Sequence, residues 1–251
     1  MMSFYLLILF IVFSNGLRKI NVNDWNRTSC GPTDQITKWG QLITVDNVAG
    51  QPGIFGYPRP QTIRNDNWFN LNGLWEFQGS STQQNINPNN TLTQQILVPF
   101  PTESCLSGVG VTYKYLQYGT TFDDIKNRGS NTRVLLQFGA IDWETQAVYV
   151  NGKYIGNHTG GYDSFYFDIT DVMKTSDNDL YISVYDPSDS GAQPEGKQRI
   201  SAINKPGGDT YTPSSGIWQT VWIESVPSTY ISKYKIYTEL ESVTVNVSVS
   251  G

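Results

Sequence analysis

The chain has 251 residues, of which 13% are aromatic and only 16% are charged, and its formal net charge is −5. This length suits one or two domains, and the aromatic side chains supply enough apolar area for a core. No basic stripe is present, so the sequence argues against nucleic acid as a partner. One histidine and two cysteines are too few for the common zinc sites, and we expect neither a metal nor a cofactor.

The first 16 residues have the features of a secretory signal peptide. Phe4–Phe13 is an apolar run interrupted only by Tyr5, and it is too short to span a bilayer. Ser14-Asn15-Gly16 then supplies the small residues of a cleavage site. No Lys or Arg precedes the run, which leaves a buried N-terminal strand as the alternative. We expect residues 1–16 to be removed, no later segment to span a membrane, and the mature chain to be secreted or lumenal (extracellular or lysosomal).

Secretion would give meaning to four Asn-x-Ser/Thr sequons. We expect an exposed, glycosylated asparagine at each used sequon, while chance in an Asn-rich chain is the alternative for some of them. The four asparagines are Asn26, Asn89, Asn157 and Asn246.

The two cysteines allow two interpretations. Cys30 and Cys105 could form a disulfide in an oxidising compartment. Cys105 also lies in a turn-like segment, Pro101–Gly108, where a small buried residue would serve equally well.

Period-two alternation of apolar residues, bounded by turn residues, predicts a series of short strands and no long helix. Asn151-Gly152 lies directly between two of them and predicts a type I′ hairpin, because both residues tolerate positive φ. Regular strands at this spacing favour an all-β sandwich. The strands are expected at Leu71–Phe77, Gln95–Val98, Tyr113–Phe122, Arg133–Phe138, Ala147–Val150, Lys153–Gly156, Phe165–Ile169, Leu180–Tyr185, Gly216–Glu224, Tyr230–Tyr237 and Val243–Val249.

Three other segments read as irregular. Residues 17–55 have weak periodicity and predict an irregular N-terminal arm. Gln83–Gln95 is rich in Asn and Gln and predicts a solvated loop. Asp186–Gly208 is polar and rich in Gly and Pro, and loops of this length are usually functional or disordered.

Four blocks of sequence resemble the N-terminal sugar-binding domain of glycoside hydrolase family 2, which includes β-galactosidases, β-glucuronidases and β-mannosidases. They occur in the family's order between residues 56 and 227. The blocks are Pro58–Gln61 with Asn72–Trp75, Val98–Pro101 with Glu103–Gly108, Phe138–Trp143 continuing through Tyr149–Gly152 and His158–Thr170, and Tyr211–Gln219.

The resemblance implies an all-β chain with a galactose-binding-like jelly-roll sandwich over residues 56–227. Residues 228–251 would be the first strands of an incomplete immunoglobulin-like sandwich, whose apolar positions could mediate self-association. The sequence departs from the family at Leu116–Phe122, because the family pattern leucine–tryptophan–tyrosine–arginine–arginine–threonine–phenylalanine has lost its tryptophan and both arginines here. Gly119 stands at the first of the two arginine positions.

The family's catalytic (β/α)₈ barrel needs about 250 residues, and these 251 residues leave no room for it. The family's acid/base glutamate follows an asparagine, and no Asn-Glu dipeptide occurs. We therefore expect no catalytic residues, and no hydrolysis by this chain alone. The resemblance implies the non-catalytic sugar-binding part of a secreted family 2 glycoside hydrolase. The alternatives are a free-standing lectin-like carbohydrate-binding module and a domain with only a structural role.

Candidate substrate-binding residues lie in and after the long loop. The resemblance offers Asp209, because an aspartate just before Tyr211 reaches the sugar pocket in relatives, although the spacing differs by one residue. Tyr211 opens the last family block, and Lys197 and Arg199 are possible donors to sugar hydroxyls; solvated charges are the alternative for all three charged residues. For His158, and for the pair Asp142 and Trp143, a structural role is expected instead.

Overall fold

The computed structural model describes Arg18, Trp25–Arg27, Ser29–Gly31, Asp34, Ile36–Val48, Asn67–Lys126, Arg128–Ile203 and Lys205–Gly251. The predicted signal peptide and the family's entry segment at Pro58–Gln61 lie outside these residues. Within the described part of the chain, no helix is long and apolar enough to cross a membrane.

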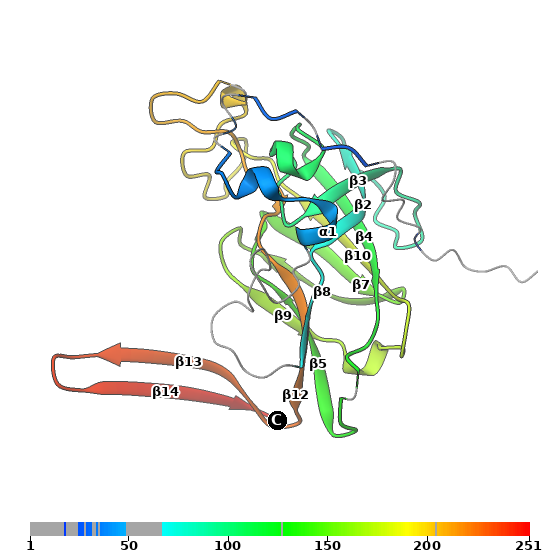
Figure 1. Ribbon diagram of the computed structural model, residues 1–251, viewed down its shortest axis with the longest axis vertical. Helices are drawn as coiled ribbons and strands as arrows, with labels where there is room; N and C mark the ends of the chain where they lie inside the picture. The colour runs from blue at the N-terminus through cyan, green and yellow to red at the C-terminus, as the bar shows by residue number, and fades with distance from the viewer. Residues whose placement is uncertain are drawn as a thin grey trace, which may run out of the picture.

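Two antiparallel sheets form the body of the molecule (Figure 1). The six-stranded sheet has the order β3-β2-β4-β10-β7-β8, and the four-stranded sheet has the order β1-β12-β5-β9. The strands of these sheets are β1 (Trp68–Asn70), β2 (Gly73–Ser80), β3 (Gln94–Val98), β4 (Tyr115–Phe122), β5 (Thr132–Phe138), β7 (Glu144–Val150), β8 (Lys153–Thr159), β9 (Phe165–Asp168), β10 (Asn178–Tyr185) and β12 (Val221–Pro227).

The core lies between the two sheets, because alternate side chains of each strand point inward. Trp75 and Phe77 of β2 and Tyr118 of β4 meet Leu136 and Phe138 of β5 in one buried cluster. Their intervening neighbours on the six-stranded sheet, such as Glu76, Gly119 and Tyr181, therefore lie on its outer face. The all-β sandwich predicted from the sequence is confirmed.

The central hairpin follows the turn chemistry of its sequence. Asn151 and Gly152 have φ values of 53° and 74°, the left-handed conformation that a type I′ turn requires at both positions. The turn places Val150 of β7 opposite Lys153 of β8. Asn151 also donates through Nδ2 to the carbonyl of Val172 at 2.7 Å, which ties the turn to the neighbouring loop.

The segment Gly216–Glu224 forms two strands, so the prediction of one continuous strand is wrong. β11 (Gly216–Ile217) pairs with the short β6 (Ile141–Asp142), whereas β12 pairs with β5. The three residues between β11 and β12 allow the chain to change partners, and Gly139 donates its N–H to the carbonyl of Thr220 at 2.9 Å. The apolar sequence of this segment does not report such a change, because strand partners are chosen only in the assembled sheet.

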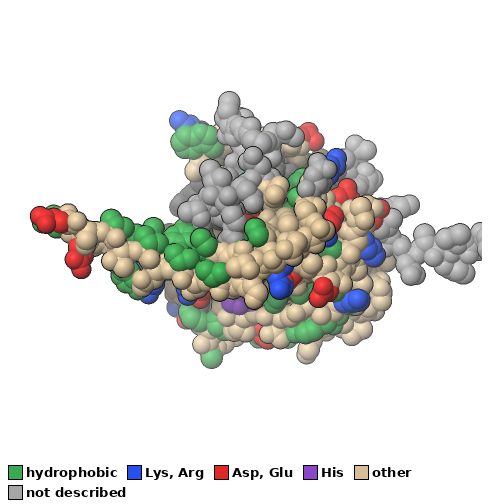
Figure 2. All heavy atoms as spheres, turned by 90° about the horizontal axis from the view of Figure 1, so that it is seen from below, with side chains coloured by type: hydrophobic (Ala, Val, Ile, Leu, Met, Phe, Trp, Pro, Cys, Tyr) green, Lys and Arg blue, Asp and Glu red, His purple; other side chains and the backbone are tan. Residues whose placement is uncertain are grey.

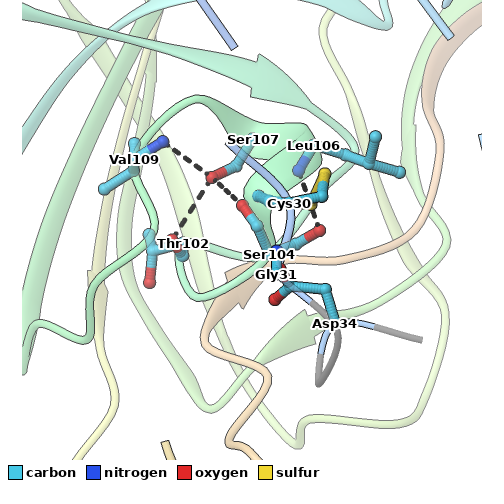
Figure 3. Close-up of a disulfide and its surroundings, with 9 residues drawn as sticks. Cys30, Gly31, Asp34, Thr102, Ser104, Leu106, Ser107 and Val109 are labelled. Carbon is cyan, nitrogen blue, oxygen red and sulfur yellow. Dashed lines mark hydrogen bonds between the residues drawn. A yellow bond between two sulfur atoms is a disulfide. The ribbon is translucent and has the colours of Figure 1, made fainter. Parts of the chain in front are cut away.

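The N-terminal arm is tied to the sandwich by a disulfide between Cys30 and Cys105 (Figure 3). Cys105 lies in a short 3₁₀ turn, Cys105–Ser107, capped by the Ser104 hydroxyl, which accepts from the Leu106 N–H at 3.2 Å. The pairing alternative is thus the one realised, and Cys105 is also buried.

The arm is less irregular than its sequence indicates. It contains a 3₁₀ turn at Gly40–Leu42 and one turn of α-helix, α1 (Val45–Val48). Val48 is fully buried against Leu74 and Leu97 of the six-stranded sheet. These apolar contacts are long-range in sequence, so local periodicity could not reveal them.

Among the described residues, the last two strands, β13 (Tyr230–Thr238) and β14 (Val243–Ser250), pair only with each other. Their hairpin extends away from the sandwich in Figure 1, and hydrophobic side chains line it in Figure 2. The register places apolar residues on one face and polar residues on the other. The apolar face contains Ile231, Tyr234, Ile236, Val243, Val245, Val247 and Val249. The strands match the prediction, while their assignment to an immunoglobulin-like domain and the boundary near Pro227 stay predictions.

Candidate functional site

The long loop after β10 brings three of the four predicted binding residues together. The Tyr211 N–H donates to the carbonyl of Lys197 at 2.9 Å, and the Arg199 N–H donates to the carbonyl of Tyr211 at 3.0 Å. The Lys197 ammonium lies 5.8 Å from the centre of the Tyr211 ring. Arg199 is also paired with Glu195 at 3.2 Å. The result is an exposed aromatic side chain, Tyr211, with the Lys197 ammonium near its ring and its backbone carbonyl bonded to the Arg199 N–H.

Asp209 stands apart from this group. It lies in a tight turn in which Gly207 and Thr210 exchange two backbone hydrogen bonds of 3.2 Å. Gly208, with a φ of 61°, supplies the left-handed residue of that turn. The Asp209 side chain is exposed, and its part in ligand binding stays a prediction.

Gln198 joins the loop to the sandwich. Its Nε2 donates to Asp142 Oδ2 at 3.1 Å and to the Tyr162 hydroxyl at 3.4 Å. Its Oε1 accepts from the Ser214 N–H at 2.6 Å. Because one side chain contacts β6, the segment after β8 and the end of the loop, Gln198 sets the position of Lys197 and Arg199 on either side of it.

Two aromatic rings continue the site beyond Gln198. Tyr162 and Trp218 meet edge to face, with ring centres 6.3 Å apart. The Trp218 Nε1–H donates to the carbonyl of Gly161 at 2.8 Å, which fixes the indole in place. Tyr162 is 52% exposed, so its ring can contact a ligand, while Trp218 is half-buried.

Three buried carboxyl groups lie beneath this surface. The relative solvent exposure is 7% for Glu103, 4% for Asp142 and 2% for Asp186. Glu103 Oε2 accepts from the Ser215 N–H at 2.9 Å, and Asp186 Oδ1 accepts from the Ser188 N–H at 2.7 Å. The three groups therefore fasten both ends of the long loop to the sandwich.

Burial raises the pKa of each of these carboxyl groups, because a charged carboxylate is poorly solvated inside the protein. The pKa of Asp142 rises to about 6, through desolvation first and the nearby charge of Asp186 second, against the lowering effect of the Gln198 hydrogen bond. Burial likewise raises the pKa of Glu103 and of Asp186, while the hydrogen bonds to Ser215 and Ser188 oppose it. The loop attachments are consequently sensitive to protonation.

His158 has the structural role expected of it. Its ring stacks on Phe165 with centres 4.0 Å apart. Burial lowers the pKa of His158, against the opposite effect of Asp163, which favours the neutral ring at neutral pH. Trp143 is half-buried and follows Asp142 through a cis peptide bond. Asp142 is buried and belongs to the carboxyl cluster, so the two residues do not form a pair on the surface.

A second concave region opens between the arm and the six-stranded sheet, with a volume of about 590 Å³. Trp25 and Tyr113 contribute aromatic side chains to its lining, together with Glu76, Gln94 and Gln95. Aromatic rings with amide and carboxyl groups suit a polyhydroxylated ligand. Sequence reasoning missed this cleft, because Trp25 lies in the arm, far from the strands in sequence.

All four sequon asparagines are exposed, as expected. Asn157 donates through Nδ2 to the Tyr154 hydroxyl at 2.8 Å. Sequence reasoning also missed Glu103, Asp186, Gln198, Tyr162 and Trp218 as parts of the site. The position of Asp186 at the start of a long polar loop was the available signal for that residue.

Comparison with known proteins finds similarity between this chain and part of several named glycosidases. Residues 98–219 match the family model described as "Glycosyl hydrolase 2 galactose-binding domain-like". A protein of Formosa agariphila named "Putative beta-glucuronidase" is 28% identical over 173 residues, which is 67% of this chain and 19% of that protein. A β-galactosidase of Thermoanaerobacter pseudethanolicus is 25% identical over 55% of this chain and 18% of its own length. The chain thus spans about a fifth of the length of these curated relatives.

Solved structures agree in fold. The β-glucuronidase of Ruminococcus gnavus superposes with a TM-score of 0.58 at 22% identity, covering 76% of this chain and 35% of that one. The β-glucuronidase of Bifidobacterium dentium gives a TM-score of 0.53 at 23% identity, over 72% of this chain and 33% of that one. The sandwich, the family model and the relatives agree: residues 98–219 form a domain of the glycosyl hydrolase 2 galactose-binding-like type.

Proposed function

We propose that this chain is the non-catalytic, sugar-binding part of a secreted family 2 glycoside hydrolase. The observation that carries the proposal is the grouping of Lys197, Arg199 and Tyr211 beside Tyr162 on the loop that Gln198 fixes to the sandwich. An exposed aromatic ring with a nearby ammonium group can stack on a sugar ring and donate to its hydroxyl or carboxylate oxygens.

The carboxyl cluster supports a non-catalytic role. Retaining hydrolysis needs two carboxyl groups about 5 Å apart that reach the glycosidic bond from solvent. Glu103, Asp142 and Asp186 have raised pKa values, which would suit a general acid, but they are almost fully buried under the loop. They hold the loop through backbone and side-chain hydrogen bonds, and a glycoside has no route to them.

Secretion is part of the proposal. Four exposed sequon asparagines and a disulfide suit an oxidising compartment, extracellular or lysosomal. Expression in a secreting cell should yield a chain that begins after Gly16 and loses mass on enzymatic deglycosylation. A chain retained in the cytosol with its first 16 residues intact would contradict it.

The binding test uses methyl β-glucuronide and methyl β-galactoside titrated into the full chain, followed by ligand-observed NMR. We expect dissociation constants on the order of 1 mM or weaker for a surface of this size. Tyr211→Ala and Arg199→Ala should each abolish the ligand signal, whereas Lys235→Ala, on the distant hairpin, should not. Aryl β-glycosides should not be hydrolysed. Equal binding by all four proteins would exclude this surface as the sugar site.

A free-standing lectin-like module remains the second candidate, because the cleft beside Trp25 and Tyr113 could hold a saccharide without any other domain. Trp25→Ala separates the two ideas in the same titration. Loss of binding in Trp25→Ala with retention in Tyr211→Ala would favour the lectin-like module over the family 2 arrangement.

The C-terminal hairpin is proposed as a surface for self-association. Its apolar face includes Val243, Val245, Val247 and Val249, which are 49–65% exposed, and open strand edges invite pairing. The polar face carries Asn246, so a glycan there would leave the apolar face free.

A further inference from the structure

The outer face of the six-stranded sheet contains a pocket that holds the side chain of Arg18. Only 5% of this side chain is exposed, although it comes from the N-terminal arm and not from the sandwich. Its Nε donates to Asp179 Oδ1 at 2.7 Å and its Nη1 to Glu76 Oε2 at 3.0 Å. Its Nη2 donates to the carbonyl of Pro88 at 2.7 Å. All three guanidinium nitrogens are thus engaged, in the fork geometry specific to arginine.

The floor of this pocket is a glycine. An added Cβ on Gly119 would come within 2.5 Å of Arg18 Nη1 and 2.6 Å of its Cζ, so the guanidinium lies directly on the Gly119 backbone. The side of the pocket is Tyr181, whose ring centre is 5.6 Å from Arg18 Cζ and which supplies a cation–π contact.

The strand register explains why these groups meet. Gly119 of β4 lies opposite Glu76 of β2 on one side and opposite Tyr181 of β10 on the other. All three therefore lie in one row on the outer face. Asp179, two residues before Tyr181, shares that face. The loop between β2 and β3 closes the pocket through the carbonyls of Pro88 and Asn90.

Gly119 is also where this sequence departs from its family, since the family pattern carries arginine at that position. We propose that the row formed by Glu76, Gly119 and Tyr181 is a guanidinium-binding pocket, and that Arg18 fills it from the arm in place of the arginine missing at position 119. The glycine and the distant arginine are then one coupled change: the glycine makes room for the guanidinium that Arg18 supplies. The pocket selects a monoalkylguanidinium group and anchors the start of the arm.

The coupling between Arg18 and Gly119 is tested by removing the arginine at position 18 and placing one at position 119. Arg18→Ala should lower the melting temperature by about 5–10 °C, because it leaves two partly buried carboxylates without their cation. Gly119→Arg alone should also destabilise the chain, because its Cβ would overlap the Arg18 guanidinium. The double variant Arg18→Ala/Gly119→Arg should recover most of the loss. Arg27→Ala, an exposed arginine of the same arm, is the matched control and should leave the melting temperature unchanged.

Chemical rescue provides a second measurement on the same proteins. Methylguanidinium chloride at about 10 mM should raise the melting temperature of Arg18→Ala by a few degrees through binding to the vacated pocket, whereas methylammonium chloride at equal ionic strength should not. The double variant should not respond, because its pocket is filled.

Additive effects of the two substitutions would overturn the proposal, as would equal responses to the two salts. If Arg18→Ala does not fold at all, a folded double variant supports the exchange, and an unfolded one contradicts it.

Discussion

Compared with the unchanged chain, the Asp142→Asn variant should gain stability as the pH rises from acid to neutral. The pKa of Asp142 is raised from 3.8 to about 6 in the folded state. The folded protein therefore holds this proton more tightly than the unfolded chain, so stability is present below pH 3.8 and is lost as the pH rises through 6. The Asp142→Asn side chain keeps an oxygen that can accept from Gln198 and carries no charge.

The magnitude follows from the two pKa values. A shift of about 2.2 units corresponds to roughly 3 kcal/mol of stability lost well above pH 6. By pH 4.5 only about 1 kcal/mol of this loss has occurred, so about 2 kcal/mol separates pH 4.5 from pH 7. Burial acts to raise the pKa of Asp168, but hydrogen bonds from Thr170 and Arg133 outweigh it and leave that pKa lowered. The stability that Asp168 contributes therefore increases with pH in both proteins and masks the effect of Asp142 in either one alone. The quantity to measure is the difference in unfolding free energy between the two proteins at each pH.

Urea unfolding of both proteins at pH 4.5, 5.5, 6.5 and 7.5 would give that difference directly. We expect Asp142→Asn to gain about 2 kcal/mol on the unchanged chain between the lowest and highest pH. Asp209→Asn, which makes the same substitution at an exposed aspartate, is the matched control. A flat difference for Asp142→Asn would refute the view that a buried, costly carboxylate lies under the loop.

The remaining predictions concern the disulfide, the hairpin and the sequons. Cys30→Ser/Cys105→Ser opens a 75-residue crosslink and should cost up to about 4.5 kcal/mol in urea unfolding; insensitivity to both this change and added reductant would mean that the arm contributes nothing to stability. Deleting residues 230–251 should leave the melting temperature almost unchanged and reduce self-association in sedimentation velocity, whereas unfolding would place the hairpin in the sandwich core. Asn157→Gln should remove one glycan mass from protein secreted by a glycosylating cell, and an unchanged mass would show that this sequon is unused.

Local sequence signals were sufficient for most of the sandwich. Asn151-Gly152 specifies its own turn, because the required φ values belong to those residue types. Strands such as β5 and β10 alternate strongly enough to show which face is buried. The break between β11 and β12 was missed, because it depends on which strand each half pairs with, and that is a property of the assembled sheet.

The candidate site was predicted only in part. Lys197, Arg199 and Tyr211 were found through composition and family resemblance, and the structure brings them together. Asp209 was proposed from the family resemblance, and its part in binding stays a prediction. Gln198 was missed because its importance comes from three partners distant in sequence, and no local pattern distinguishes such a glutamine from a solvated one.

The disulfide also changes what a protease can do to this molecule. The bond from Cys30 to Cys105 reaches across the start of the sandwich, so the main chain between these residues is not the only link between arm and body. A single cut anywhere between the two cysteines would break the polypeptide while both pieces stayed covalently joined. Such a nicked protein would migrate as one species in a denaturing gel until reduced.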